Sequence, residues 1–372
     1  MDHHMTDRSN IVNGLDLIKP EVRVLSAYTL HPYAYQHKLN QNENPFGYPE
    51  ELKQKVWERV ACQDWARYPD FDLVEITAKL AAHNDVAPEQ VLVGNGSNEL
   101  IYVTLAVTLT RGDGVILPVP TFSLYKLISC VMGAVVHEIQ MHPSDNFALP
   151  PLEVIKRAQA HRARVVILCT PNNPTATAYP LDEVRRVVAE SGALVIIDEA
   201  YREFADNQDC ARLLDEFSNV VILRTFSKAM AMGGLRVGYA IARPEVAREI
   251  HKAKLPYALN SFSEAAAVVA LDNPAPFAAE MARIKAGREW LSHQLQTIPD
   301  LHVYPSAANF FLVRFERHNP AAVFHALLER EGILVRDVSH YPGLAGHLRL
   351  SVGTPEQNRL LVETLRSVMR ET

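Results

Sequence analysis

The residues best suited to chemistry lie in one short stretch, Thr225–Arg236, with the sequence TFSKAMAMGGLR. It joins two strand-like runs and offers the hydroxyl of Ser227, the amine of Lys228 and the guanidinium of Arg236. A lysine amine can form an imine with an aldehyde, and a serine with an arginine fork can hold a phosphate. Such a stretch by itself usually forms a solvated loop. Its interpretation as a functional site therefore depends on what the rest of the chain supplies.

A glycine-rich turn, from Gly94 to Glu99, follows another strand-like run and leads into a helical pattern. It is similar to a dinucleotide fingerprint, but Glu99 stands where the third glycine should be. We therefore expect a single phosphate held by backbone N–H groups at the helix start, which the helix dipole favours. A tight turn with no ligand is the alternative.

Two further loops follow strand-like runs. Phe122 could stack on a planar ring, although an aromatic residue at a helix start is more often part of the core. Asn172 and Asn173 stand between Pro171 and Pro174, which makes their loop stiff and fixes the directions of its amides. A plain turn is again the alternative.

A carboxylate, Asp198, comes directly after the apolar run Leu194–Ile197. An unpaired carboxylate at the mouth of a buried strand is costly, so a cationic or protonated group should face it. Tyr201, three residues on, could reach the same site. An amine, a carboxylate, a phenol, amides, an aromatic face and phosphate-binding groups together describe a pocket for pyridoxal phosphate.

Short runs rich in β-branched residues recur along the chain and predict the strands that must position these groups. The runs are Gln90–Val93, Gly114–Val119, Ala134–Ile139, Val165–Cys169, Leu194–Ile197, Val220–Leu223 and Val237–Ile241. Helical patterns fill most of the gaps, at Asn98–Leu109, Thr121–Met132, Leu152–Gln159 and Leu181–Glu190. This alternation predicts an α/β fold with a mostly parallel seven-stranded sheet and helices on both faces, with ligands at the carboxyl ends of the strands.

The chain of 372 residues is long enough for two domains. Residues 1–50 have little periodicity and predict an arm that contributes to the small domain and to dimer contacts. Residues 51–262 form the predicted large domain. Long helices and alternating strands after this point predict a smaller α+β domain over residues 263–372.

Composition excludes several classes of function. The net charge of −6 and the absence of a basic tract argue against nucleic acid as a partner. Four scattered cysteines without a CxxC pair predict neither a metal site nor disulfides. The chain start lacks the pattern of a secretory signal and no apolar run is long enough to span a membrane, so we expect a cytoplasmic protein.

The combined pattern resembles the fold type I aminotransferases, and within them the histidinol-phosphate aminotransferase family. The resemblance runs from about Arg23 to the C-terminus. The motifs that carry it are Asn44-Pro45, Arg67-Tyr68-Pro69-Asp70, Gly94-Asn95-Gly96-Ser97, Asn172-Asn173-Pro174-Thr175, Asp198-Glu199-Ala200-Tyr201, Ser227-Lys228 and Arg236. They are more specific for cofactor and fold than for substrate.

The resemblance implies a role for each group in the pocket. Lys228 would bind pyridoxal 5′-phosphate as an imine and shuttle a proton, and Asp198 would keep the pyridine nitrogen protonated. Tyr201 and Asn173 would hold the phenolic oxygen of the cofactor, and Phe122 would stack on its ring. The phosphate would lie against Gly96, Ser97, Asn98, Ser227 and Arg236, and Tyr68 would reach the neighbouring active site of a homodimer.

The substrate residues implied by the resemblance are fewer. Arg349 and Arg336 would hold anionic groups of the substrates, Tyr28 would close over the ligand, and Asn44 would also contribute. Without the resemblance, a surface ion pair with Asp337 or another carboxylate would be the better interpretation of Arg336.

The sequence departs from the family pattern at three places. Asn98 replaces the usual Asp, Ala176 replaces a typical Gly, and Met230-Ala231-Met232 replaces a small or aromatic stretch. None of these changes removes a catalytic group.

The expected activity is ping-pong transamination between L-histidinol phosphate and 2-oxoglutarate. The alternatives are an aromatic or broad-specificity aminotransferase, which would share every cofactor residue, and a threonine-phosphate decarboxylase. A transcription regulator with the same fold would need a DNA-binding segment for which the residues before the resemblance are too few.

Overall fold

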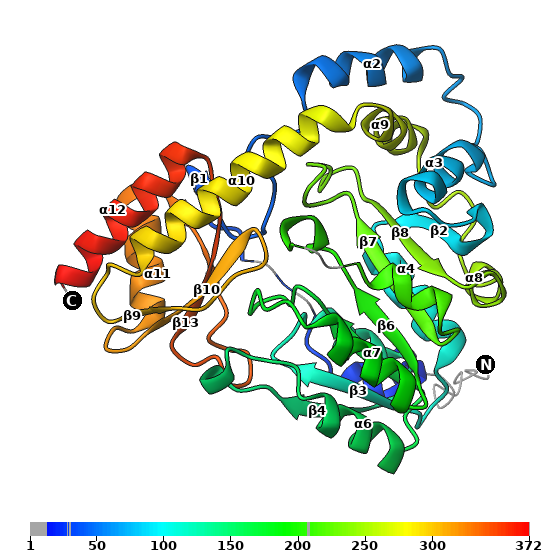
Figure 1. Cartoon of the computed structure of the whole chain (residues 1–372), viewed down its shortest axis with the longest axis horizontal. Coiled ribbons are helices and arrows are strands. Elements are labelled where there is room, and N and C mark those ends of the chain that lie inside the picture. Colours follow the sequence, from blue (N-terminus) through cyan, green and yellow to red (C-terminus); the bar gives the residue numbers. More distant parts are fainter. Residues whose placement is uncertain (1–12, 28, 30, 207–208, 372) are drawn as a thin grey trace, which may run out of the picture.

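The computed structural model describes residues 13–27, 29, 31–206 and 209–371. Its main feature is a large sheet with helices on both faces, beside a smaller layered part built around a second sheet (Figure 1). Within the described residues, no helix is both long and apolar enough to cross a membrane.

The large sheet has the seven strands expected from the sequence. They are β2 (Val91–Asn95), β3 (Gly114–Val119), β4 (Val135–Gln140), β5 (Val165–Cys169), β6 (Leu194–Asp198), β7 (Val220–Thr225) and β8 (Val237–Ala242). Their order is β2-β8-β7-β6-β5-β3-β4, and β8 alone runs antiparallel to its two neighbours. The prediction of a mostly parallel sheet is therefore confirmed.

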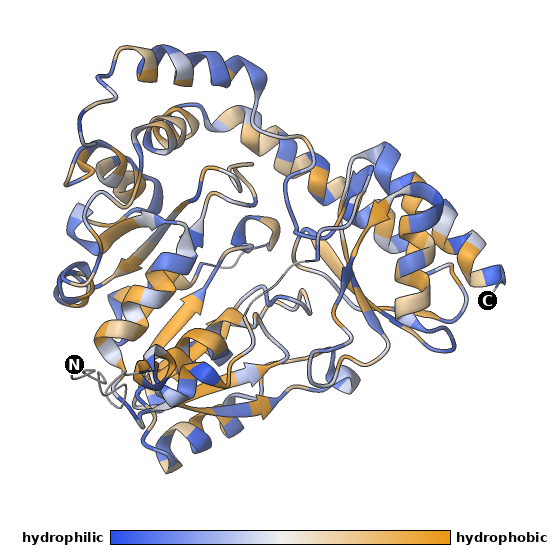
Figure 2. Cartoon of the chain, turned by 180° about the vertical axis from the view of Figure 1, so that it is seen from behind, coloured by the Kyte–Doolittle hydropathy of each residue, from blue (hydrophilic) through white to orange (hydrophobic). Residues whose placement is uncertain are grey.

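Both faces of this sheet are apolar because successive side chains of each strand point to opposite sides. Val195 and Ile197 of β6 join the core on one face, and Ile196 joins the core on the other. The first face is covered by α2 (Glu50–Ala61), α3 (Val74–Asn84), α6 (Pro151–Ala160), α7 (Leu181–Glu190) and α9 (Ser261–Asp272). The second is covered by α4 (Ser97–Thr108), α5 (Leu124–Val131) and α8 (Pro244–His251). Figure 2 shows hydrophobic strands inside and hydrophilic outer helix faces.

The smaller part contains an antiparallel sheet of order β12-β13-β10-β9. Its strands are β9 (Leu301–Val303), β10 (Phe310–Phe315), β12 (Arg336–Asp337) and β13 (His347–Ser351). The helices beside it are α10 (Pro274–Leu295), α11 (Pro320–Glu331) and α12 (Pro355–Glu371). A separate core of Phe, Leu, Ile and Val side chains fills the space between these helices and the sheet.

The N-terminal arm attaches to this smaller part. After the short α1 (Pro20–Arg23), the strand β1 (His37–Lys38) pairs in parallel with β11 (Ile333–Leu334). The backbone N–H of Ser351 then donates to the carbonyl of Leu39 at 3.1 Å. The arm thus continues from the smaller sheet towards the carboxyl ends of the large sheet.

Three helices, α1, α8 and α11, were not predicted from the sequence. Each has proline at its first turn, and α11 has an Asn319 cap and ends at Gly332 with φ +61°. These are regular start and stop signals. The predicted domain boundary at residue 262 lies inside α9, which packs on α2 and α3 over the large sheet. The three-part division stays a prediction.

Replacement of Gly238 by alanine should destabilise the fold. A Cβ at this position of β8 would lie only 2.3 Å from the backbone nitrogen of Ser97, so strand β8 and the β2–α4 turn would have to separate. We expect the free energy of unfolding to fall by about 1–3 kcal/mol in denaturant titrations. Gly234→Ala is the control, because a Cβ there meets nothing within 4 Å. Equal unfolding midpoints for the two variants would contradict this account.

Candidate active site

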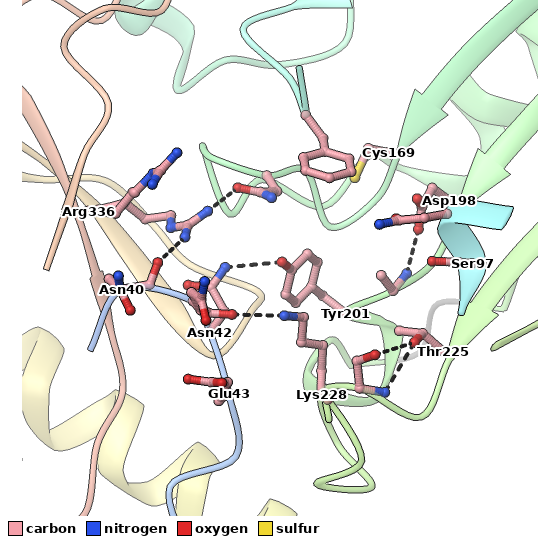
Figure 3. Close-up of a pocket in the computed structure, with 18 of the residues that line it drawn as sticks. Asn40, Asn42, Glu43, Ser97, Cys169, Asp198, Tyr201, Thr225, Lys228 and Arg336 are labelled. Carbon is pink, nitrogen blue, oxygen red and sulfur yellow. Dashed lines mark hydrogen bonds between the residues drawn. The ribbon is translucent and has the colours of Figure 1, made fainter. Parts of the chain in front are cut away.

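A pocket of about 250 Å³ lies where the carboxyl ends of the large sheet meet the N-terminal arm and the smaller sheet (Figure 3). Eleven of the predicted site residues line it. These are Ser97, Asn98, Phe122, Asn173, Asp198, Tyr201, Ser227, Lys228, Arg236, Arg336 and Arg349. Residues far apart in the sequence therefore meet in one cavity, as the strand-end argument predicts.

Lys228 lies in the turn after β7 and points into this pocket. Its Nζ donates to the carbonyl oxygen of Gln41 in the N-terminal arm at 2.8 Å. Burial, together with the positive charge of Arg349, lowers the pKa of Lys228 to about 8, and the negative charge of Glu43 opposes this shift. A substantial fraction of the amine is therefore neutral near pH 7–8, which is the form that attacks a carbonyl carbon.

Asp198 ends β6 and is 3 % exposed. Its Oδ1 accepts the backbone N–H of Ala200 at 3.0 Å, and its Oδ2 accepts the hydroxyl of Tyr125 at 2.7 Å. Burial raises the pKa of Asp198 to about 6, although the two hydrogen bonds act in the opposite direction. This carboxylate is suited to a cationic partner in the pocket, because such a partner would restore the charged form.

The phenol and amide predicted beside Lys228 also face the pocket. Tyr201 accepts the side-chain N–H of Asn42 at 3.1 Å through its hydroxyl, and burial raises the pKa of Tyr201 to about 12. The carbonyl oxygen of Asn173 accepts a hydrogen bond from the guanidinium of Arg349. Asn173 belongs to the loop after β5 and Arg349 to β13, so this bond connects the two sheets.

The phosphate-binding groups form a compact cradle on the other side of Lys228. The hydroxyl of Ser227 accepts hydrogen bonds from Thr225 at 2.9 Å and from Arg236 at 3.3 Å. Gly96 lies against the guanidinium of Arg236, where a Cβ would be 2.4 Å from Nη2. Only glycine, at φ +76°, allows this approach. The helix α4 begins directly after it, with Ser97 and Asn98 in its first turn.

Three predicted site residues among those that the structure describes do not line the pocket. Gly96 lies behind Arg236, as described. Asn44 instead donates to the carbonyl of Ala229 and to the carboxylate of Glu280, at 3.2 and 3.0 Å. Tyr68 is 80 % exposed and stacks on Tyr257 with ring centroids 4.6 Å apart. Tyr28 lies outside the described residues.

Several residues of the pocket were missed at the sequence level. They are Asn40, Gln41, Asn42, Glu43, Tyr125, Cys169, Ala200, Thr225, Gly233, Val338 and Tyr341. Tyr125 and Thr225 lie within strand-end segments already singled out, so their position was an available signal. The segment from Asn40 to Glu43 enters the pocket only through pairing of the arm with the smaller sheet, which no local pattern reveals.

The substitution at Ala176 affects the backbone. Ala176 is fully buried at φ +62°, a conformation that alanine adopts with strain and glycine without it. Its N–H donates to Asn172 O at 2.7 Å, and its carbonyl accepts from Ala307 N at 2.9 Å. These two backbone hydrogen bonds hold the loop that displays Asn173 in spite of the strain at Ala176.

The donor set fits an aldehyde that carries a phosphate and a basic ring nitrogen. The partly neutral amine of Lys228 would bind the aldehyde, and the buried carboxylate of Asp198 would face the ring nitrogen. The cradle of Ser97, Ser227 and Arg236 supplies the phosphate-binding donors. Phe122 packs against Tyr125 with ring centroids 5.5 Å apart and lines the pocket as the predicted stacking residue.

The raised pKa of Asp198 predicts a pH-dependent cost to folding of the ligand-free protein. The pKa of Asp198 in the folded protein, about 6, lies above the reference value of 3.8. The protonated form of Asp198 therefore stabilises the fold at low pH, and this contribution to the free energy of unfolding is lost as the pH rises through 6. Asp198→Asn should remove this cost. The free energy of unfolding of the variant relative to the parent should rise by up to about 3 kcal/mol between pH 4 and pH 7. A pH-independent difference would contradict the assignment.

Comparisons with known proteins agree with this geometry. The family model described as aminotransferase class I and II matches residues 35–365. A histidinol-phosphate aminotransferase of Prosthecochloris aestuarii is 38% identical over 352 residues, which cover 94% of this chain and 97% of that protein. The one of Thermoanaerobacter pseudethanolicus is 35% identical over 354 residues, covering 95% and 99%.

Solved structures share the fold. A crystal structure of a putative histidinol-phosphate aminotransferase from Erwinia carotovora atroseptica is 25% identical, with a TM-score of 0.84 over 93% of this chain and 99% of that one. The Sinorhizobium meliloti histidinol-phosphate aminotransferase, solved in complex with pyridoxal-5′-phosphate, has a TM-score of 0.85 at 22% identity and covers 99% of both chains. This chain therefore belongs to the class I and II aminotransferase family, whose enzymes depend on pyridoxal 5′-phosphate.

Proposed function

We propose that this chain is a histidinol-phosphate aminotransferase of histidine biosynthesis. It exchanges an amino group between L-histidinol phosphate and 2-oxoglutarate, giving imidazole-acetol phosphate and L-glutamate in two half-reactions of a ping-pong cycle. The observation that carries the proposal is a pair of arginines, Arg336 and Arg349, that face the pocket of Lys228. The names of the relatives described above support the same choice.

The two arginines are an unfavourable pair until an anion binds between or beside them. Arg336 of β12 lies directly opposite Arg349 of β13 in the antiparallel ladder. Like charges in this relation destabilise a sheet, and a phosphate or carboxylate removes the repulsion. Arg336 lines the pocket and does not pair with Asp337, whose Oδ1 accepts the N–H of Ser339 at 2.8 Å. The two arginines therefore support binding of a dianionic phosphate in one half-reaction and of the carboxylates of glutamate in the other.

The side chains of the pocket divide the remaining work. Lys228 would hold the cofactor through its aldehyde carbon, and its Nζ, when released from that carbon, would accept and return the proton of the substrate carbon that carries the amino group. Asp198 would hold a positive charge at the ring nitrogen. When bound, pyridoxal phosphate supplies an electron sink for the transfer. Tyr201 and Asn173 hold the phenolic oxygen, and Ser97, Ser227 and Arg236 hold the phosphate through charge-assisted hydrogen bonds.

We also propose a homodimer in which Tyr68 completes the pocket of the neighbouring subunit. Tyr68, Phe71 and Tyr257 form an exposed aromatic surface, linked by ring contacts of 4.6 and 5.6 Å centred on Tyr257. All three side chains are more than 40 % exposed. Exposed aromatic clusters of this kind are typical of protein interfaces. Tyr68 has no place in the pocket of its own chain, which supports a role across the interface.

Substitution of Arg336 tests whether this residue binds the phosphate of the proposed substrate. Arg336→Gln should lower kcat/KM for histidinol phosphate about 10- to 100-fold, because a charge-assisted hydrogen bond to the phosphate is lost. The absorbance of the bound cofactor should not change. Arg330→Gln removes an exposed arginine that pairs with Glu371 at 2.7 Å, and it should have no effect on kcat/KM.

The same assay should compare amino donors on the unaltered protein. Histidinol phosphate should give a higher kcat/KM than phenylalanine or tyrosine, and glutamate should complete the second half-reaction. A higher kcat/KM with phenylalanine would favour an aromatic aminotransferase, and release of carbon dioxide from threonine phosphate would favour the decarboxylase.

Hybrid dimers test the role of Tyr68. Lys228→Ala should abolish the absorbance of the covalently bound cofactor and turnover, and Tyr68→Ala should weaken turnover and cofactor binding. Mixing the two variants should restore turnover above either parent, because one site of the hybrid then has both Lys228 and the Tyr68 of the other subunit. Activity that never exceeds that of Tyr68→Ala would show that Tyr68 acts within its own chain or not at all.

A further inference from the structure

The Asp198 carboxylate is held by a phenol that none of the roles above uses. Tyr125 donates its hydroxyl to Oδ2 at 2.7 Å, while Oδ1 accepts the N–H of Ala200 at 3.0 Å. Tyr125 is 1 % exposed, so water does not compete for this bond. With both oxygens engaged, the carboxyl group has a single orientation towards the pocket, and each oxygen keeps a lone pair for a further donor.

Tyr125 is fixed by the first turn of α5. Its backbone N–H donates to the carbonyl of Phe122 at 3.2 Å, and its own carbonyl accepts the hydroxyl of Ser129 at 2.8 Å. The rings of Phe122 and Tyr125 pack edge to face, with centroids 5.5 Å apart. The same turn of chain thus positions the ring of Phe122 at the pocket and the hydroxyl of Tyr125 against Asp198.

The groups around Asp198 explain why this donor matters. The negative charge of Glu199 raises the pKa of Asp198, and the positive charge of Lys228 lowers it. Asp198 in turn raises the pKa of the Cys169 thiol, which burial raises most. Burial raises the pKa of the Tyr125 phenol well above its ordinary value, so the phenol stays protonated and remains a donor. Tyr125 and the N–H of Ala200 are therefore the hydrogen bonds that offset the desolvation of the carboxylate.

We propose that Tyr125 is a positioning residue: its hydroxyl fixes the Asp198 carboxylate in the orientation and charged state in which it holds the protonated ring nitrogen of the cofactor. This inference rests on the dependence of the family on pyridoxal phosphate and not on the identity of the amino donor. The proposed effect of the Tyr125 hydroxyl on the cofactor is exerted through Asp198.

Tyr125→Phe tests the proposal because it keeps the ring and removes only the hydroxyl. The dissociation constant of pyridoxal phosphate, measured by equilibrium dialysis against the purified protein, should rise about 10-fold or more, as expected for a lost hydrogen bond to a charged group. The acid-side midpoint of cofactor binding should move to higher pH, because loss of the donor raises the pKa of Asp198. The pH titration of the absorbance of the bound cofactor should shift with it.

Tyr239→Phe is the matched control. Tyr239 is also buried, with 4 % exposure, and its hydroxyl lies 3.3 Å from Asn84 Oδ1 on the other face of the same sheet. This variant should leave the dissociation constant and the acid-side midpoint unchanged. Equal effects of the two variants, or no effect of Tyr125→Phe, would overturn the proposal.

A double-mutant cycle separates positioning from general packing. In an Asp198→Ala background, the further change Tyr125→Phe should alter the cofactor dissociation constant less than 2-fold, because the hydroxyl acts through the carboxylate. An undiminished effect in that background would mean that Tyr125 acts elsewhere. All of these measurements use the cofactor alone, so failure of the histidinol-phosphate assignment would appear only in the amino-donor assay and would leave them unchanged.

Discussion

The placement of one buried carboxylate constrains the whole site. Asp198 ends a strand that is apolar on both faces, and charge there is tolerated only because donors converge on it from α5 and from its own turn. Because β5, β6 and β7 run parallel, the loops that follow them open at the same edge of the sheet. Lys228, Asn173 and Tyr201 lie near Asp198 for the same reason, and the chemistry of the pocket follows from strand direction.

The two sheets contribute to the pocket in different ways. The large sheet supplies the lysine, the buried carboxylate and the groups of the proposed phosphate cradle. The smaller sheet supplies Arg336 and Arg349, for which we propose a role in binding the substrate anions. The hydrogen bond between Arg349 and Asn173 joins the two sets. A substrate anion therefore meets a guanidinium that is already oriented by the wall of the cofactor site.

Most of the large sheet could be predicted because its strands are short runs rich in Val, Ile and Leu. The bounds of β3 and β5 agree with the prediction residue for residue. The start and stop signals of α8 and α11 are present in the sequence, but the pattern of alternating strands alone does not predict these two helices.

The site residues divide along the same line. Lys228 and Asp198 follow strands and are visible locally, whereas Asn42 meets Tyr201 across 159 positions of sequence. Local pattern carries no information on such a contact, because it depends on how two sheets are docked. The role proposed for Tyr68 is even harder to predict from the sequence, because it needs a second chain.

The attachment of the arm has a consequence for the order in which the chain can mature. Most hydrogen-bond partners of residues 36–42 lie in the last part of the chain, at Asn309, Gly332, Leu334, Arg349 and Ser351. During synthesis, the segment that forms the wall opposite Lys228 leaves the ribosome long before these partners, and before Tyr201 and Lys228, which it also contacts. Closure of such a long loop is slow and entropically costly. The strands of the large sheet all precede residue 243, so this sheet can form before the arm finds its partners in the smaller part and closes the pocket.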